Sequence, residues 1–98
     1  MERKPHRALW LGLALMLAAT ANLGAQGMKV IVDQDARGPA TTDMQSILEF
    51  LESNQFEVLG ITTVSGDQWV REETAHTLRL LEIAGRADVP VIQGAEFP

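Results

Sequence analysis

Val30–Asp43 reads VIVDQDARGPATTD, and this stretch decides the fold class of the chain. Its first three residues are apolar and β-branched, which is typical of a strand covered on both faces of a parallel sheet. Ligands of such sheets collect beyond the carboxyl ends of the strands. Asp33 and Asp35 follow the apolar run, and side chains two residues apart on extended backbone point the same way. We therefore expect these two carboxylates to converge, with Asp43 joining them if the intervening loop folds back.

Carboxylates this close together repel one another unless a positive charge lies among them. A hard cation with oxygen ligands meets that requirement. The spacing of Asp33, Asp35 and Asp43 therefore indicates a metal site. The same three charges would also suit a solvated loop that leads into a helix N-terminus.

Helices and strands are predicted to alternate along the rest of the chain. A helix is expected from Asp43, with Thr42 as its N-cap and Gln45 completing a capping box. Its apolar face is formed by Met44, Ile47, Leu48 and Leu51. Residues 56–64 are β-branched and mostly apolar, and they predict a second buried strand.

A second helix is predicted over residues 68–84, with Asp67 as a candidate cap and Gly85 as its stop. Its inner stripe is expected to be Val70, Thr74, Leu78 and Leu81. Residues 88–92 predict a short third strand. The order βαβαβ indicates an α/β fold with an open, parallel, Rossmann-like sheet.

Residues 1–25 have the pattern of a secretory signal peptide, because basic residues precede the apolar stretch 8–19. Small residues place the cleavage within 21–25, which leaves 26–98 as the mature region. The protein is therefore expected to be exported, to a periplasmic or extracellular location, without stable membrane association after cleavage. The alternative is an uncleaved membrane anchor, which Thr20 and Asn22 weaken.

The composition limits the partners. The 98 residues carry a formal net charge of −5 and show no basic patch, which argues against a nucleic-acid partner. Cysteine is absent, so no disulfide stabilises the chain. Three parallel strands and two helices would leave sheet edges and apolar faces uncovered. We expect the N-terminal part of a larger protein, inactive alone; a small domain that dimerises is the alternative.

Three blocks of this sequence resemble the inosine-uridine-preferring nucleoside hydrolase family. They are VIVDQDARGPATTD, EVLGITTVSGD and HTLRLLEIAGRADVPVIQGA, and they span most of the mature region in the order and spacing typical of the family. The resemblance implies the N-terminal βαβαβ portion of the nucleoside hydrolase fold. It also implies hydrolysis of ribonucleosides to ribose and free base for purine and pyrimidine salvage. A small nucleoside is the implied substrate, a homo-oligomer is compatible with the full-length form, and calcium is the implied cofactor.

The resemblance also assigns roles to individual residues. Asp35 corresponds to a calcium ligand that is also the general base, and Asp43 to the other main calcium ligand of this segment. Asp33 corresponds to a supporting carboxylate. The sequence departs from the family pattern at Thr42, which replaces an aspartate that grips a ribose hydroxyl, and at Asp67, which replaces an asparagine. The loop between Asp35 and Asp43 is also longer than in the family.

Four other side chains are candidate functional groups. His76 lies in mid-helix, where a solvated or packed histidine is expected rather than a general acid. Trp69 and Phe56 could stack on a base, but packing in the core or an interface is expected. Arg37 could neutralise the acidic loop, contact substrate, or be an exposed loop charge.

Two other functions fit parts of the sequence. A divergent relative that binds a riboside or calcium without catalysis would account for Thr42 and Asp67. A haloacid-dehalogenase-like phosphatase also begins with a strand and Asp-x-Asp, but Ala36-Arg37 is not its usual continuation, and no lysine follows to meet phosphate.

Overall fold

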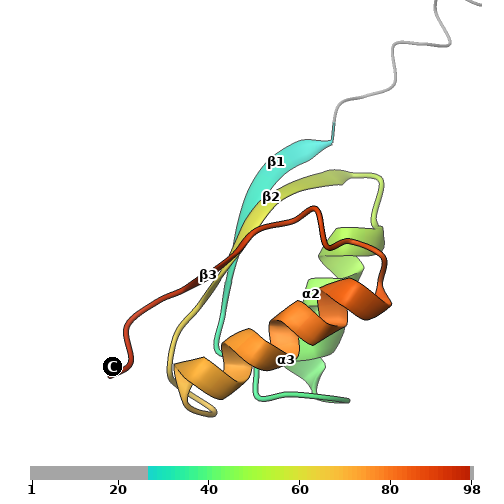
Figure 1. Cartoon of the computed structure of the whole chain (residues 1–98). Helices are drawn as coiled ribbons and strands as arrows, with labels where there is room; N and C mark the ends of the chain where they lie inside the picture. The colour runs from blue at the N-terminus through green and yellow to red at the C-terminus, as the bar shows by residue number, and fades with distance from the viewer. Residues whose placement is uncertain (1–26, 98) are drawn as a thin grey trace, which may run out of the picture.

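The computed structural model describes residues 27–97, which form five elements. In chain order these are β1 (Met28–Gln34), α2 (Thr42–Glu52), β2 (Phe56–Thr63), α3 (Val70–Ile83) and β3 (Val91–Gln93), as Figure 1 shows. The predicted βαβαβ order is confirmed. The predicted signal peptide lies outside the described residues. Neither described helix is long and apolar enough to cross a membrane.

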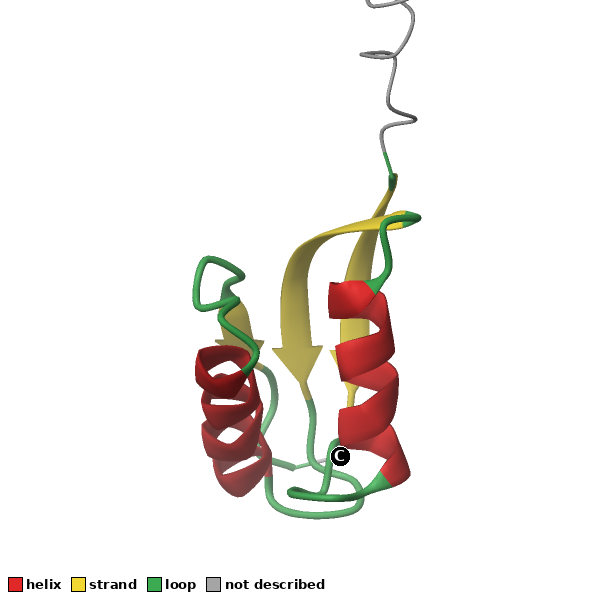
Figure 2. Cartoon of the chain, turned by 90° about the vertical axis from the view of Figure 1, so that its right-hand side faces the viewer, coloured by secondary structure: helices red, strands yellow, loops and turns green. Residues whose placement is uncertain are grey.

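The three strands form one parallel sheet in the order β1-β2-β3. Each helix connects neighbouring strands, and both connections advance in the same direction. Crossovers of one hand that advance in one direction place their helices on the same face of a sheet. Figure 2 shows α2 and α3 side by side on that face. The open parallel sheet expected from the sequence is therefore confirmed.

The core lies between this face and the two helices. Val32 of β1 and Ile61 of β2 are neighbours in the parallel register, and both are buried. Ile47 and Leu51 of α2 and Leu81 of α3 pack against them. Removing these side chains from water is the main favourable contribution to folding.

The opposite face of the sheet is open, as predicted for three strands with only two helices, so β1 is not covered on both sides within residues 27–97. Ile31 of β1 is 66% exposed, Leu59 of β2 is 46% exposed and Ile92 of β3 is 59% exposed. Because both crossovers run on the other side, no element among residues 27–97 covers this face. We call Ile31, Leu59 and Ile92 the open apolar face.

Helix α2 begins one residue earlier than predicted. Thr41 is its N-cap, Thr42 is its first residue, and no side chain caps its end, so the predicted capping box is wrong. The reason lies in the preceding loop, where the Thr41 hydroxyl donates to the Gly38 carbonyl at 2.8 Å. The predicted inner face is confirmed at Met44, Ile47 and Leu51, whereas Leu48 is 37% exposed.

Helix α3 begins two residues later than predicted. Its N-cap is Trp69, and Asp67 makes no capping hydrogen bond, so the proposed cap is wrong. A closed turn holds Gln68 outside the helix, because its carbonyl accepts the Gly66 N–H at 3.1 Å. The Val70 N–H instead donates to Ser65 Oγ at 2.9 Å.

The buried side chains of α3 also differ from the predicted stripe. They are Val70, Glu73, Thr77 and Leu81, whereas Leu78 is 47% exposed. The predicted stop at Gly85 is confirmed. Gly85 has a φ of 68°, and the Arg86 N–H returns to the Leu81 carbonyl at 2.8 Å, which is the Schellman arrangement.

Candidate carboxylate site

A hollow of about 430 Å³ lies at the carboxyl end of the sheet and is lined by Asp35, Asp43, Gly66 and Asp67. Asp35 directly follows β1, Asp43 is in the first turn of α2, and Gly66 and Asp67 follow β2. Parallel strands end at the same edge, so residues more than 20 positions apart meet there. We call this hollow the carboxylate site.

Gln34, the last residue of β1, connects Asp35 with the start of α2. Its side-chain oxygen accepts the Asp35 N–H at 3.0 Å, and its side-chain nitrogen donates to Ser46 Oγ at 3.3 Å. Ser46 Oγ in turn donates to the Asp43 carbonyl at 2.8 Å. Gln34 thus links the backbones of both aspartates, although the sequence analysis did not single it out.

Asp43 lies at the positive end of the α2 dipole, which favours a carboxylate there. Gly66 lies directly against Asp35. A Cβ atom at Gly66 would clash with Asp35 Oδ2 and would lie 2.8 Å from Asp35 Cβ. Only glycine therefore allows the turn after β2 to approach Asp35 this closely.

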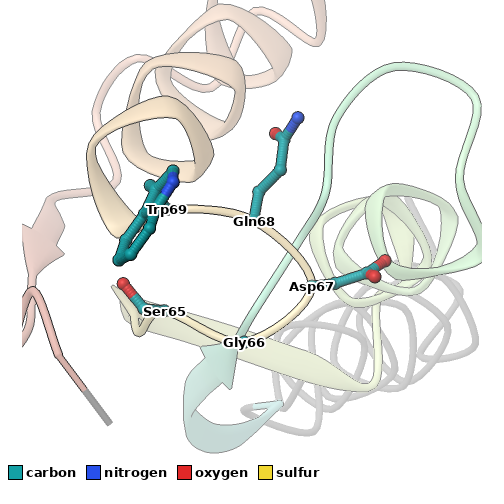
Figure 3. Close-up of a pocket in the computed structure, with 5 residues that line it drawn as sticks. All are labelled: Ser65, Gly66, Asp67, Gln68 and Trp69. Atoms are coloured by element: carbon teal, nitrogen blue, oxygen red, sulfur yellow. The ribbon is translucent and has the colours of Figure 1, made fainter.

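Asp67 points away from Trp69, toward the loop that precedes α2, as Figure 3 shows. Arg37 of that loop approaches it, with 4.0 Å between Arg37 Nη1 and Asp67 Oδ1. Both side chains are largely exposed, so this ion pair is weak. On the other side of the turn, Ser65 to Trp69 line a second hollow of about 410 Å³.

Asp33 and Thr42 do not line the carboxylate site. Asp33 is on β1, next to Thr62 in the register, and its Oδ1 accepts the Thr62 hydroxyl at 2.6 Å. Asp33 therefore shares the sheet face of Ile31, whereas Asp35 has left the strand. Thr42 is exposed on the first turn of α2.

The donor chemistry of the site suits a hard cation, because carboxylate oxygens are the preferred ligands of calcium and magnesium. The set of possible metal ligands among the described residues is incomplete. Within residues 27–97 no three acidic, histidine or cysteine side chains lie close enough together to hold a metal ion. Asp35, Asp43 and Asp67 therefore form part of a ligand set at most.

Glu73 of α3 is a further acidic residue near the site that the sequence analysis missed. Its side chain is fully buried, and its Oε1 accepts the Gln68 N–H at 2.8 Å. Burial raises the pKa of Glu73, opposed by the Gln68 N–H and reinforced by the charge of Asp35. The signal was present in the sequence, since Glu73 lies three residues after Val70 and eight before Leu81, on the inner stripe of the helix.

The structure separates the remaining candidates from the carboxylate site. His76 packs against Gly38, and together with Pro39 and Met44 it lines a different hollow of about 240 Å³. The expectation of a packed histidine is thus confirmed. Phe56 packs on Phe50, with ring centroids 4.8 Å apart.

Trp69 does not lie in the core. It is 59% exposed, and it meets Phe97 edge-on with ring centroids 6.2 Å apart. Of the two expectations for Trp69, core packing is wrong within residues 27–97, and packing in an interface stays a prediction.

These features define a class of protein: a parallel α/β sheet with acidic groups gathered at the carboxyl ends of its strands, where such folds bind their ligands. The chain belongs to the inosine-uridine preferring nucleoside hydrolase family, whose model matches residues 30–98. Its βαβαβ arrangement is that of the N-terminal part of the nucleoside hydrolase fold. The family is generally metal-dependent.

Curated relatives share the matched region. Uridine nucleosidase 1 of Arabidopsis thaliana is 40% identical over 70 residues, which are 71% of this chain and 20% of that protein. Probable uridine nucleosidase 2 of the same plant is 39% identical over 66 residues, or 67% of this chain and 20% of that protein. An uncharacterized protein of Schizosaccharomyces pombe is 39% identical over 71 residues, or 72% of this chain and 22% of that protein. The chain thus spans about a fifth of the length of these relatives.

Proposed function

We propose that the protein hydrolyses the N-glycosidic bond of ribonucleosides to ribose and free base, with calcium bound at the carboxylate site. The observation that carries this proposal is the hollow shared by Asp35, Asp43 and Asp67 at the strand ends of a nucleoside hydrolase family member. Two relatives are named as uridine nucleosidases, which makes uridine the first substrate to test.

The carboxylates suit this reaction. Breaking the N-glycosidic bond builds positive charge on the ribose ring, and anionic groups beside the ring stabilise that charge. Asp35 accepts a proton from the attacking water, and Asp35 and Asp43 would be the metal ligands from this part of the chain. When bound, calcium would lower the pKa of a coordinated water and fix its direction.

Asp67 and Asp33 have supporting roles. Asp67, on the turn against Asp35, offers a carboxylate to a ribose hydroxyl. Thr42 has a hydroxyl where the family pattern has a carboxylate, but it does not line the hollow and is given no role in it. Asp33 steadies the end of β1 through its hydrogen bond to Thr62.

The test is ribose release from uridine and inosine by the intact gene product, with and without a calcium chelator. Asp35→Asn is expected to lower kcat by about 10²-fold or more, because it removes the proton acceptor. Asp88→Asn, at an exposed loop carboxylate remote from the site, is the matched control and should retain the native rate. Native turnover in Asp35→Asn would disprove the role of Asp35, and a native protein that cleaves no riboside would disprove the function.

A non-catalytic riboside-binding or calcium-binding protein is the second candidate. It is favoured by Thr42 and Asp67, which depart from the family pattern, and by the lack of a three-ligand group within residues 27–97. Calorimetric titration of calcium and uridine into the intact gene product separates the two functions. Binding without ribose release supports the binding protein, and turnover supports the hydrolase.

We also propose that the protein is exported, on the basis of its first 25 residues. N-terminal sequencing of the protein from its native host should find a start within residues 22–26. A mature protein that still begins at Met1 would contradict export with cleavage and would favour the uncleaved membrane anchor.

A further inference from the structure

Glu73 is the one fully buried acidic side chain within residues 27–97, and it lies on α3 beside the turn that carries Asp67. Only one of its oxygens has a partner: Oε1 accepts the Gln68 N–H at 2.8 Å, whereas Oε2 has none among the described residues. Burying a carboxylate with half of its hydrogen-bonding capacity unused is costly. A role as a solvated surface charge therefore does not explain Glu73.

Helix capping is not a sufficient explanation, because the start of α3 is held by other groups. The Val70 N–H donates to Ser65 Oγ at 2.9 Å, and the Glu73 N–H donates to the Trp69 carbonyl at 3.1 Å. The Glu73 carboxylate reaches past these groups to Gln68, which lies before the N-cap and outside the helix. What Glu73 holds is the turn, rather than the helix end.

That turn is part of the carboxylate site. Gly66 and Asp67 line it, and the Gly66 backbone lies so close to Asp35 that a Cβ there would clash. Inside the turn, the Gly66 N–H donates to the Gln68 carbonyl at 3.1 Å. A contact that fixes the Gln68 backbone therefore also fixes the Gly66 backbone and the direction of the Asp67 side chain.

We propose that Glu73 is a positioning residue, which holds the Gly66–Gln68 turn through the Gln68 N–H and so sets Asp67 across the carboxylate site from Asp35 and Asp43. The proposal rests on the proposed function, because it assigns Glu73 a role in the site that binds ribose. Glu73 itself need not touch the substrate. Its contribution is a fixed distance between Asp67 and the other two carboxylates.

The test uses the intact gene product and three variants. Glu73→Met removes the acceptor and keeps an unbranched side chain of similar length, and Glu73→Gln keeps an acceptor oxygen for Gln68. Glu72→Gln is the matched control, since Glu72 is the exposed neighbour in the same helical turn. Amide hydrogen exchange reports the turn, and uridine kinetics report the site.

In the native protein, the Gln68 amide should exchange as slowly as amides in the middle of α3. Glu73→Met should speed exchange at Gln68 about tenfold or more and raise KM for uridine about tenfold, with a smaller change in kcat. Glu73→Gln should restore both values to within about threefold, and Glu72→Gln should leave them unchanged. A purely structural role would not give this rescue together with a selective change in KM.

Three results would overturn the proposal: a fast-exchanging Gln68 amide in the native protein, an unchanged KM in Glu73→Met, or a Glu73→Gln variant that resembles Glu73→Met. Exchange of the Gln68 amide in the native protein needs no variant, so it tests the proposal even if Glu73→Met fails to fold. If the native protein cleaves no riboside, the proposed function fails, while the exchange measurements still determine whether Glu73 holds the turn.

Discussion

Gly66 is the position at which the carboxylate site tolerates least change. Gly66→Ala would push a methyl group into Asp35, and the turn would have to move. We expect a loss of about 1–3 kcal/mol in the free energy of unfolding and a fall in uridine turnover of about tenfold or more. Urea denaturation and initial rates measure the two effects.

Gly85→Ala provides the control for this substitution. Gly85 has a φ of 68° and no atom near an added Cβ, so alanine there costs about 1–2 kcal/mol of backbone strain without a clash. It lies at the far end of α3 and should keep native turnover. Equal losses of activity in both variants would show that Gly66 acts through stability alone.

Glu73 should make stability depend on pH. Its pKa is raised in the folded protein, mainly by burial, so its contribution to stability is fully present below the unfolded value of 4.5. That contribution is lost as pH rises through the raised folded value. Glu73→Gln should therefore raise Tm at pH 8 and raise it less, or not at all, at pH 4.

Differential scanning calorimetry of the native protein and Glu73→Gln across this pH range measures the difference. Glu72→Gln, at the exposed neighbour, should show little pH-dependent difference from the native protein. A Tm difference that is constant from pH 4 to pH 8 would mean that Glu73 does not change its protonation on folding.

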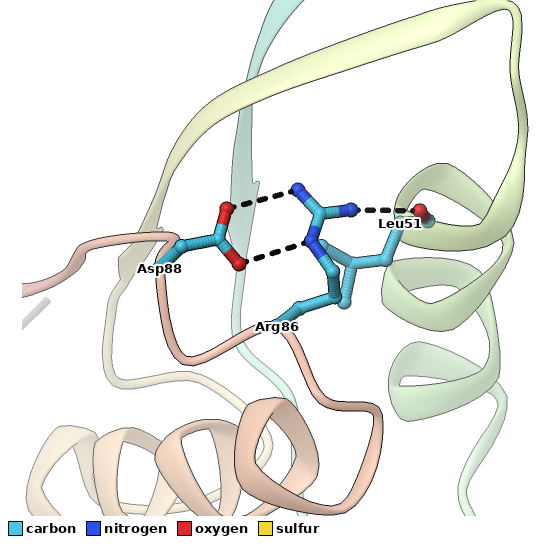
Figure 4. A network of polar contacts seen from close by, with 3 residues as sticks. All are labelled: Leu51, Arg86 and Asp88. Atoms are coloured by element: carbon cyan, nitrogen blue, oxygen red, sulfur yellow. Dashed lines mark hydrogen bonds and ion pairs between the residues drawn. The ribbon is translucent and has the colours of Figure 1, made fainter.

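At the scale of elements, Arg86 connects the ends of the two helices, as Figure 4 shows. Its Nη1 donates to the Leu51 carbonyl at 3.0 Å, and its Nε donates to Asp88 Oδ1 at 3.1 Å. Lysine carries its donors on one nitrogen and lacks the planar fork with which arginine spans these two acceptors. We expect Arg86→Lys to lower the free energy of unfolding by about 1 kcal/mol, as measured by urea denaturation.

Arg79→Lys is the control, because Arg79 makes only an exposed pair with Glu82 within α3. It should change the free energy of unfolding by less than about 0.5 kcal/mol. If both substitutions have the same effect, the contact of Arg86 with Leu51 adds nothing beyond a surface ion pair.

Periodicity and strand chemistry were enough to predict the element types and their order, because apolar spacing reports which face is buried. The boundaries were harder to predict. Thr41 and Thr42 are equally good N-caps by sequence, and the Thr41 bond to Gly38 decides between them. Likewise, the turn closed by Gly66 and Gln68 displaces the start of α3, and a turn of this kind has no propensity signal.

Parallel topology was enough to predict part of the candidate site. Asp35 and Asp67 follow strands, Asp43 lies in the first turn of α2 at the same sheet edge, and the three do line one hollow. Asp33 was expected to converge with Asp35, but it remains on the strand and bonds to Thr62. Side chains two residues apart point the same way only on extended backbone, and β1 ends at Gln34, before Asp35.

At the scale of the whole molecule, the arrangement of both helices on one side leaves the sheet half covered. Parallel strands are normally buried on both faces, and Ile31, Leu59 and Ile92 have the apolar character of that environment. Apolar side chains exposed together on one face are a surface for association. The open apolar face should therefore govern how residues 26–98 behave in solution when they are isolated.

We expect residues 26–98, prepared without the apolar stretch 8–19, to bind the dye ANS and to self-associate, because the open apolar face gathers exposed side chains from all three strands. Replacing Ile31, Leu59 and Ile92 together by threonine keeps β-propensity and should lower ANS fluorescence about threefold or more. Sedimentation velocity should then show a shift toward monomer. As a control, Ile83→Thr removes an exposed apolar side chain from α3, on the other side of the sheet, and should change neither signal. If the triple variant binds ANS as strongly as the native chain, the dye reports a loosened core between the sheet and its helices rather than the open apolar face.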